Sequence, residues 1–342
     1  MRVASWLPWL LPLVTTTATL VLGHVACGGS VDAPGAATSS DAAAPDAAND
    51  AIDNRPSPTK PTDCFADLAG PVPGPNYDRF APKMGRHCAG TQAQSIRGVE
   101  KLVFLGDSIT QGTPPTASNQ IYRARVEAGV RARFGDVEVK NCARWGARMA
   151  DLANDPKSGQ KGQLETCFAA AVEPKRTLVV MTLGGNDVHA WSGDNLTPAE
   201  GQAVADEAAG QLRSALDWLK DKARFPNGSF VIFGNVYEYT DTTGDLSSCP
   251  AANLTGNGGV FKAGEPIVSH FEEELVRHAV ETGSDVLFLL ENFCGHGYHR
   301  DDPALQCYRG PGAELWFDFT CIHPTPKGHE KIAEYVLSVV DG

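Results

Sequence analysis

Five short runs rich in aliphatic residues recur between residues 100 and 290, separated by polar or glycine-containing segments. A run such as Leu178–Leu183 is apolar on every residue but Thr182. Such continuity is typical of a strand that is buried on both faces of a parallel sheet. We therefore predict strands at 102–105, 137–139, 178–183, 230–233 and 286–290.

Between these runs, apolar residues recur at the three- and four-residue spacing of amphipathic helices. The clearest helix start is Thr197-Pro198-Ala199-Glu200, where the threonine is an N-cap and the proline occupies the first turn. Helices are predicted at 120–134, 160–172, 197–222, 266–282 and 325–339. Strands that alternate with crossover helices predict an α/β fold, a three-layer α/β/α sandwich around a central parallel sheet.

The carboxyl ends of parallel strands meet at one edge of the sheet, and ligands of such sheets bind there. Polar motifs follow three of the predicted strands, so we expect these motifs to converge at that edge. Two long excursions, 237–265 and 291–317, leave the strand–helix pattern, and we expect their shapes to set substrate selectivity.

Residues 1–27 have the pattern of an export signal, with Arg2 before a mainly apolar stretch. The stretch contains Pro8 and Pro12, which weaken it as a permanent membrane helix. Its end, Val25-Ala26-Cys27-Gly28, resembles a bacterial lipobox, although His24 stands where an aliphatic residue is usual. That resemblance implies lipidation of Cys27 and a membrane tether, and simple secretion is the alternative.

Residues 28–61 are rich in Ala, Asp, Ser and Pro and contain no aromatic residue. A segment of this composition cannot bury enough apolar surface to offset its ordering entropy, so we predict a disordered linker. The folded domain is expected at 62–342.

The whole chain has 342 residues, 42% of them hydrophobic, and a formal net charge of −12. The length suffices for one large domain. The negative charge and the lack of a basic run argue against a nucleic-acid partner.

Nine cysteines are present, and eight remain once Cys27 is set apart. An even number behind an export signal indicates disulfides formed in an oxidising compartment. Cys64 with Cys88, Cys142 with Cys167, and Cys294 with Cys307 are close enough in sequence to pair, and buried free thiols are the alternative. No CxxC pair or HExxH motif occurs, so neither a metal site nor a cofactor is predicted.

The stretch Leu102–Gly112 combines an apolar strand with a polar turn that contains Ser108. A serine at a strand end is held on a rigid element, which suits an attacking nucleophile. In the alternative interpretation, Ser108 only caps a helix.

Four motifs, taken in chain order, resemble the SGNH subgroup of the GDSL hydrolases. They are Gly106-Asp107-Ser108-Ile109-Thr110-Gln111-Gly112, Asn141-Cys142-Ala143-Arg144-Trp145-Gly146, Gly184-Gly185-Asn186-Asp187, and His323-Pro324. The resemblance spans roughly 230 residues, and four motifs in order are a stronger signal than any one of them. It implies a flavodoxin-like SGNH hydrolase fold and a serine hydrolase that cleaves carboxylic esters.

The resemblance also implies roles for single residues. Ser108 would be the nucleophile and His323 the base, while the N–H groups of Ser108 and Gly146 and the amide of Asn186 would form an oxyanion hole. Each residue has a structural alternative. Gly146 could only serve a tight turn, Asn186 could be an Asx-turn residue, and His323 could be a surface histidine before a proline.

The third triad member departs from the family, which places an aspartate three residues before the histidine. Thr320 stands at that position here, and the nearest aspartate is Asp318, five residues before His323. We expect Asp318 to reach the other imidazole nitrogen, and a Ser–His dyad oriented by a backbone carbonyl is the alternative.

Two function classes fit these observations. The first is an esterase, lipase or carbohydrate deacetylase that acts on a small-molecule, glycan or lipid ester. The second is an envelope-anchored binding protein that keeps the fold without activity. The presence of Ser108, Gly146, Asn186 and His323 together favours the enzyme.

Overall fold

The structure is a computed structural model, and it describes residues 57–342 except 154–160, 195, 256–257 and 262–263. The described residues belong to one unit, Arg55–Gly342. The predicted export signal with Cys27 and most of the predicted linker therefore lie outside the described residues. Among the described residues, no helix has the length and apolar character needed to span a bilayer.

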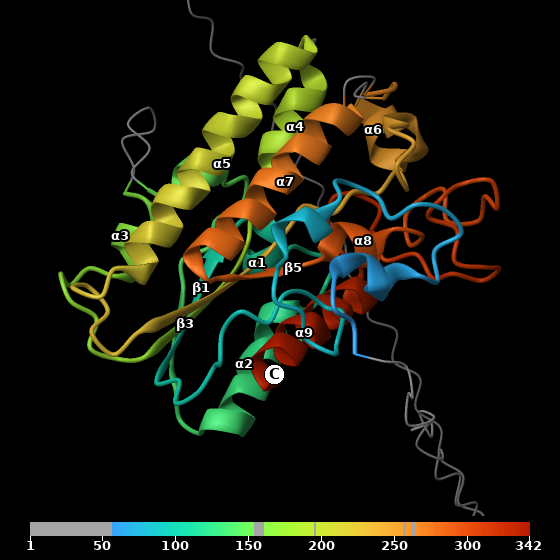
Figure 1. The fold of residues 1–342 in the computed structure, drawn as a ribbon. Coiled ribbons are helices and arrows are strands. Elements are labelled where there is room, and N and C mark those ends of the chain that lie inside the picture. Colours follow the sequence, from blue (N-terminus) through green and yellow to red (C-terminus); the bar gives the residue numbers. More distant parts are fainter. Residues whose placement is uncertain (1–56, 154–160, 195, 256–257, 262–263) are drawn as a thin grey trace, which may run out of the picture. The chain divides into compact units, whose positions relative to one another are not determined.

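Five parallel strands form the central sheet in the order β2-β1-β3-β4-β5 (Figure 1). This order is the doubly wound arrangement of flavodoxin-like folds. Neighbouring strands are in a continuous register, in which Phe104 pairs with Val180 and Val180 with Ile232. The strands are β1 (Lys101–Gly106), β2 (Glu138–Asn141), β3 (Thr177–Thr182), β4 (Ser229–Gly234) and β5 (Asp285–Leu287).

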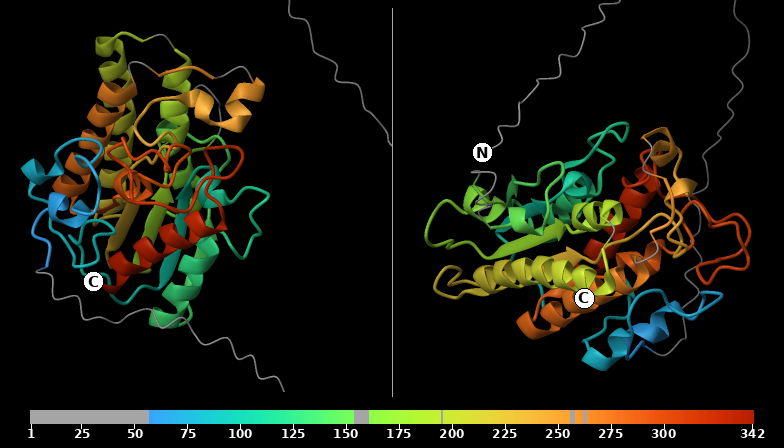
Figure 2. Two further views of the ribbon diagram at one scale, coloured as in Figure 1. Left: turned by 90° about the vertical axis from the view of Figure 1, so that its right-hand side faces the viewer. Right: turned by 90° about the horizontal axis from the view of Figure 1, so that it is seen from above.

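Two pairs of helices cover the sheet, one pair on each face (Figures 1 and 2). Helices α5 (Pro198–Lys220) and α7 (Gly264–Thr282) pack on one face, and α2 (Tyr122–Phe134) and α9 (Pro326–Asp341) on the other. Alternate strand residues supply the two cores: Val103 of β1 packs with the α5–α7 layer and Leu102 with the α2–α9 layer. The predicted three-layer α/β/α sandwich is confirmed.

The structure corrects two element predictions. The predicted helix 160–172 is only the short α3 (Gln163–Cys167), and the predicted strand 286–290 ends at Leu287. The apolar run continues instead into helix α8 (Leu289–Phe293), where Leu289 and Leu290 are also buried. A short apolar run does not reveal by its pattern whether it is strand or buried helix.

Several short helices were not predicted, and two of them begin directly after a strand of the sheet. Those two are α1 (Ser108–Gln111), after β1, and α4 (Gly185–Gly193), after β3. The others are α6 (Pro250–Thr255) and the 3-10 helices η1 (Pro61–Phe65), η2 (Tyr77–Phe80), η3 (Met149–Asp151) and η4 (Leu246–Ser248).

Four disulfides pair all eight cysteines of the domain. The pairs Cys64–Cys88, Cys142–Cys167 and Cys294–Cys307 confirm the predicted short-range bridges. The fourth, Cys249–Cys321, closes a separation of 72 residues and was not predicted. It ties the first excursion to the segment that leads into His323.

Candidate active site

Ser108 is the first residue of α1, at the carboxyl end of β1. Gly106 makes this sharp turn possible, because its φ is +127° and an added Cβ would lie 2.2 Å from the carbonyl oxygen of Thr182. The buried Asp107 caps α1 by accepting the Ile109 N–H at 3.0 Å, and it also accepts the Thr182 hydroxyl at 3.1 Å. Asp107 thus fixes the turn on which Ser108 stands.

His323 lies in the loop before α9, and its Nε2 is 2.9 Å from the Oγ of Ser108. The two residues are 215 positions apart in the chain. The loop itself is closed by an antiparallel bridge between Phe317 and Pro324 and by the Asp318 N–H, which donates to the His323 carbonyl at 2.9 Å. Burial lowers the pKa of His323 below its usual range, while the charge of Asp318 opposes this shift. A neutral imidazole at neutral pH suits a proton acceptor.

The partner of the second imidazole nitrogen, Nδ1, differs from the sequence prediction. Nδ1 of His323 lies 2.8 Å from the hydroxyl of Thr320, not against Asp318. The carboxylate of Asp318 instead accepts the Thr320 hydroxyl at 2.5 Å and the Thr320 N–H at 2.8 Å. Asp318 therefore turns toward its own loop, and among the described residues Nδ1 bonds neither to this carboxylate nor to the backbone carbonyl of the dyad alternative. The sequence signal for Thr320 was its place three residues before the histidine.

Asn186 lies in the first turn of α4, after the Gly184-Gly185 pair. One of its two amide hydrogens donates to the carbonyl of Ala147 at 2.9 Å. This bond fixes the side chain, and an amide nitrogen has a second N–H to offer. The neighbouring Asp187 accepts the Met149 N–H at 3.1 Å, and burial raises its pKa to about 6.

Gly146 precedes Ala147 and has a φ of +73°. A Cβ added to it would meet no described atom within 4 Å, so its backbone borders open space. Trp145, the residue before it, donates its indole N–H to the carbonyl of Gly112 at 3.0 Å. The loop that carries Gly146 is thus bonded on one side to the segment after Ser108 and on the other to Asn186.

A pocket of about 320 Å³ includes Ser108 and Asn186 in its lining. His323 and Gly146 are not among its lining residues. Helices α4 and α7 and the first excursion supply most of its wall, whereas Phe317 is the contribution of the second excursion. Much of the lining is apolar, as shown by Val188, Val236, Leu246, Phe261, Val268 and Ile322.

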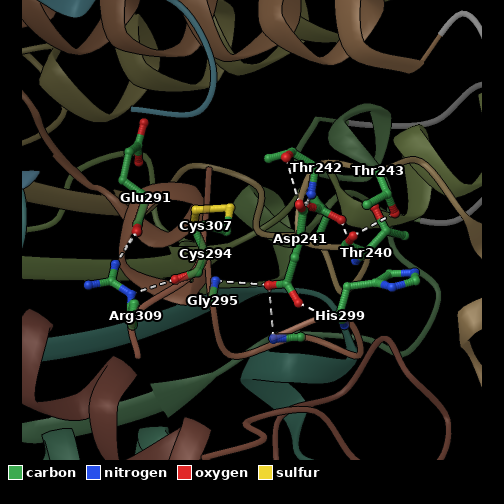
Figure 3. Close-up of a disulfide and its surroundings, with 12 residues drawn as sticks. Thr240, Asp241, Thr242, Thr243, Glu291, Cys294, Gly295, His299, Cys307 and Arg309 are labelled. Carbon is green, nitrogen blue, oxygen red and sulfur yellow. Dashed lines mark hydrogen bonds between the residues drawn. A yellow bond between two sulfur atoms is a disulfide. The ribbon is translucent and has the colours of Figure 1, made fainter. Parts of the chain in front are cut away.

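Asp241 joins the two excursions, a role that the sequence did not reveal (Figure 3). Its fully buried carboxylate accepts the N–H groups of Gly295, Gly297 and His299 at 2.8, 3.0 and 2.9 Å. The Cys294–Cys307 disulfide lies beside this contact. A buried carboxylate with three N–H donors is a rigid anchor for the pocket wall formed by the neighbouring residues 240, 242 and 243.

No group of three His, Cys, Asp or Glu side chains in the described part of the chain is arranged to hold a metal ion. Both histidines of the second excursion have other contacts. His296 stacks on Trp316 with ring centroids 3.5 Å apart, and His299 faces Asp245 at 3.3 Å.

The sequence profile of the GDSL-like lipase/acylhydrolase family matches residues 104–331. Among curated proteins, no sequence matches the chain. Of the solved structures, an extracellular lipase from Streptomyces rimosus is 18% identical with a TM-score of 0.47, over 71% of this chain and 99% of that one. Phospholipase A1 from Streptomyces albidoflavus NA297 is 17% identical with a TM-score of 0.45, over 71% and 98%.

The family match extends over more than half of the chain and contains all four sequence motifs, from the strand before Ser108 to the helix after His323. It agrees with the doubly wound sheet and with the resemblance noted from the motifs. The chain therefore belongs to the GDSL-like lipase/acylhydrolase family of ester hydrolases.

Proposed function

We propose that this protein cleaves carboxylic esters through an acyl-enzyme formed on Ser108. His323 Nε2 takes the hydroxyl proton as Ser108 Oγ bonds to the ester carbonyl carbon. The imidazolium returns that proton to the departing alkoxide as the C–O bond breaks. Water then attacks the acyl-enzyme by the same route and releases the acid. The observation that carries the proposal is the 2.9 Å contact between Ser108 Oγ and His323 Nε2, beside an apolar pocket.

The oxyanion of each tetrahedral intermediate would be held by the N–H groups of Ser108 and Gly146 and by the free N–H of Asn186. Support comes from the position of Ser108 at a helix start, the open space beside Gly146, and the fixed amide of Asn186. Such donors act because they are already in place when the charge develops.

For the substrate, we propose an ester with an apolar acyl chain. The aliphatic and aromatic wall of the pocket supports this choice. Some polar groups that the first excursion contributes to the wall are engaged within the excursion itself: Glu238 accepts the N–H groups of Thr240 and Thr242, and the Thr243 hydroxyl donates to the Thr240 carbonyl. A sugar would need polar partners of its own in the pocket, because buried unpaired hydroxyls are costly.

The test is hydrolysis of p-nitrophenyl esters from acetate to palmitate, with acetylated sugars in parallel. Each methylene that becomes buried contributes about 0.8 kcal/mol, so kcat/KM should rise by up to about fourfold per methylene until the pocket is full. Val268→Phe should lower kcat/KM for octanoate more than for acetate. Val280→Phe is the matched control, since Val280 lies on the same helix, is exposed and does not line the pocket.

Two results would speak against these proposals in different ways. Faster turnover of acetylated sugars than of octanoate would overturn the acyl-chain proposal alone. A purified, folded protein that hydrolyses none of these esters and takes no label from a fluorophosphonate would contradict the catalytic mechanism.

Asn186→Ala is expected to lower kcat by about 10²- to 10³-fold, as removal of one oxyanion donor does elsewhere. KM should change little, because the interaction strengthens only as the oxyanion forms. Asn186→Asp keeps the size of the side chain but replaces its N–H donors with an acceptor, so it should lose as much. Melting temperatures would be measured alongside, since the Asn186–Ala147 bond is also lost in the alanine variant. A kcat within fivefold of wild type in both variants would remove Asn186 from the oxyanion hole.

A further inference from the structure

A continuous series of hydrogen bonds leads from Ser108 to Asp318. Ser108 Oγ is 2.9 Å from His323 Nε2, and His323 Nδ1 is 2.8 Å from Thr320 Oγ1. Thr320 Oγ1 in turn contacts Asp318 Oδ1. The structure thus places a hydroxyl where the family has a carboxylate.

The direction of every hydrogen bond in this series follows from its last member, the carboxylate of Asp318. An ionised carboxylate only accepts, so the Thr320 hydroxyl must give its single hydrogen to Asp318. The hydroxyl oxygen can then only accept from His323, which places the imidazole hydrogen on Nδ1. Nε2 is left with its lone pair toward Ser108, as a base requires.

We propose that Thr320 is a positioning residue that transmits the orientation and charge of Asp318 to His323, in place of the family's directly bonded aspartate. The inference rests on the proposed function of Ser108 and His323.

The surroundings of Asp318 support this role. Asp318 is buried, and its second oxygen, Oδ2, has no hydrogen-bond partner in the part of the chain that the structure describes. Its first oxygen accepts both the hydroxyl and the N–H of Thr320. Within the described residues, the carboxylate of Asp318 therefore accepts hydrogen bonds from Thr320 alone. Burial lowers the pKa of His323 and the charge of Asp318 opposes this shift, while burial and the charge of His323 both lower the pKa of His329.

The backbone bond makes a clean test possible. Because the Thr320 N–H holds Asp318 on its own, Thr320→Val removes the hydroxyl while the turn keeps that bond. Thr320→Ser keeps the hydroxyl and loses one methyl group. We expect Thr320→Val to lower kcat by about 10²-fold with KM within about threefold, because the tautomer is no longer fixed. Thr320→Ser should stay within about threefold of wild type in kcat.

The aspartate itself offers a second measurement. In Asp318→Asn the amide oxygen can still accept from Thr320, so the tautomer is kept and kcat should fall by about tenfold. An aspartate bonded directly to the histidine would cost about 10⁴-fold when changed to asparagine. The double variant Thr320→Asp/Asp318→Asn restores the spacing of the family. It should move the acid limb of the kcat/KM pH profile upward by about one pH unit, because the carboxylate then contacts the imidazole.

Thr325→Val is the matched control, since Thr325 caps α9 through its hydroxyl two residues after His323. This variant should lower the melting temperature and leave the pH profile unchanged. Equal kcat in Thr320→Val and wild type, or equal losses in Thr320→Val and Thr320→Ser, would overturn the proposal. So would an unshifted acid limb in the double variant. An inactive wild-type protein would instead refute the proposed function on which this inference rests.

Discussion

Replacing Ser108 by alanine is expected to lower kcat for ester hydrolysis by about 10⁴- to 10⁶-fold. The hydroxyl oxygen is the atom that would form the acyl-enzyme, and no other group of the site replaces it. Labelling by a fluorophosphonate probe should disappear as well, because the probe reacts with an activated serine. Steady-state kinetics with the best p-nitrophenyl ester and gel-based probe labelling would measure the two effects.

The fold should tolerate this change. The contact of the Ser108 hydroxyl is with His323, and Ser108 is only partly buried, so the melting temperature should stay close to that of wild type. Ser214→Ala is the control. Ser214 lies on α5, far from Ser108 in the sequence, and its hydroxyl donates to the carbonyl of Gly210 in the same helix. A labelled and active Ser108→Ala variant would refute the assignment of the nucleophile.

His323→Ala is expected to cause a loss of similar size, since Ser108 is a weak nucleophile without its base. In the proposed mechanism the two residues act as a unit, so the double variant should lose no more than either single variant. The KM of the single variant should remain close to wild type, because the imidazole acts in the reaction step rather than in ground-state binding.

The control for this variant is His270→Ala, which removes an imidazole of α7 that pairs with Asp206 of α5 at 2.7 Å and is not among the lining residues of the pocket. Its kcat should match wild type. Additive losses in the Ser108→Ala/His323→Ala double variant would show that the two residues do not share one step.

The fold could be predicted from the sequence to a large extent, for a physical reason that particular residues illustrate. Buried strands such as β3 are apolar between their ends, and Thr197 with Pro198 marks the start of α5. Such signals are local. The convergence of the motifs that contain Ser108, Gly146 and Asn186 also follows, because the carboxyl ends of parallel strands share one edge of the sheet. The place of His323 beside Ser108 was expected only from the family resemblance.

Contacts that depend on loop conformation could not be predicted in the same way. Whether Asp318 or Thr320 faces His323 is decided by how a turn of a few residues folds on itself, and both residues fit the composition of the segment. Asp241 gives no signal either, because its three N–H donors lie more than 50 residues away in sequence.

The bridge between Cys249 and Cys321 bears on how the protein is made. Cys321 is two residues from His323, so the segment that presents the imidazole is covalently fixed only once this pair of thiols has been oxidised. A chain that folds in a reducing cytosol would carry all the groups of the site with this segment untethered. Recombinant material for kinetic work should therefore come from an oxidising host compartment or from oxidative refolding, and its content of free thiols should be determined before any rate constants are compared.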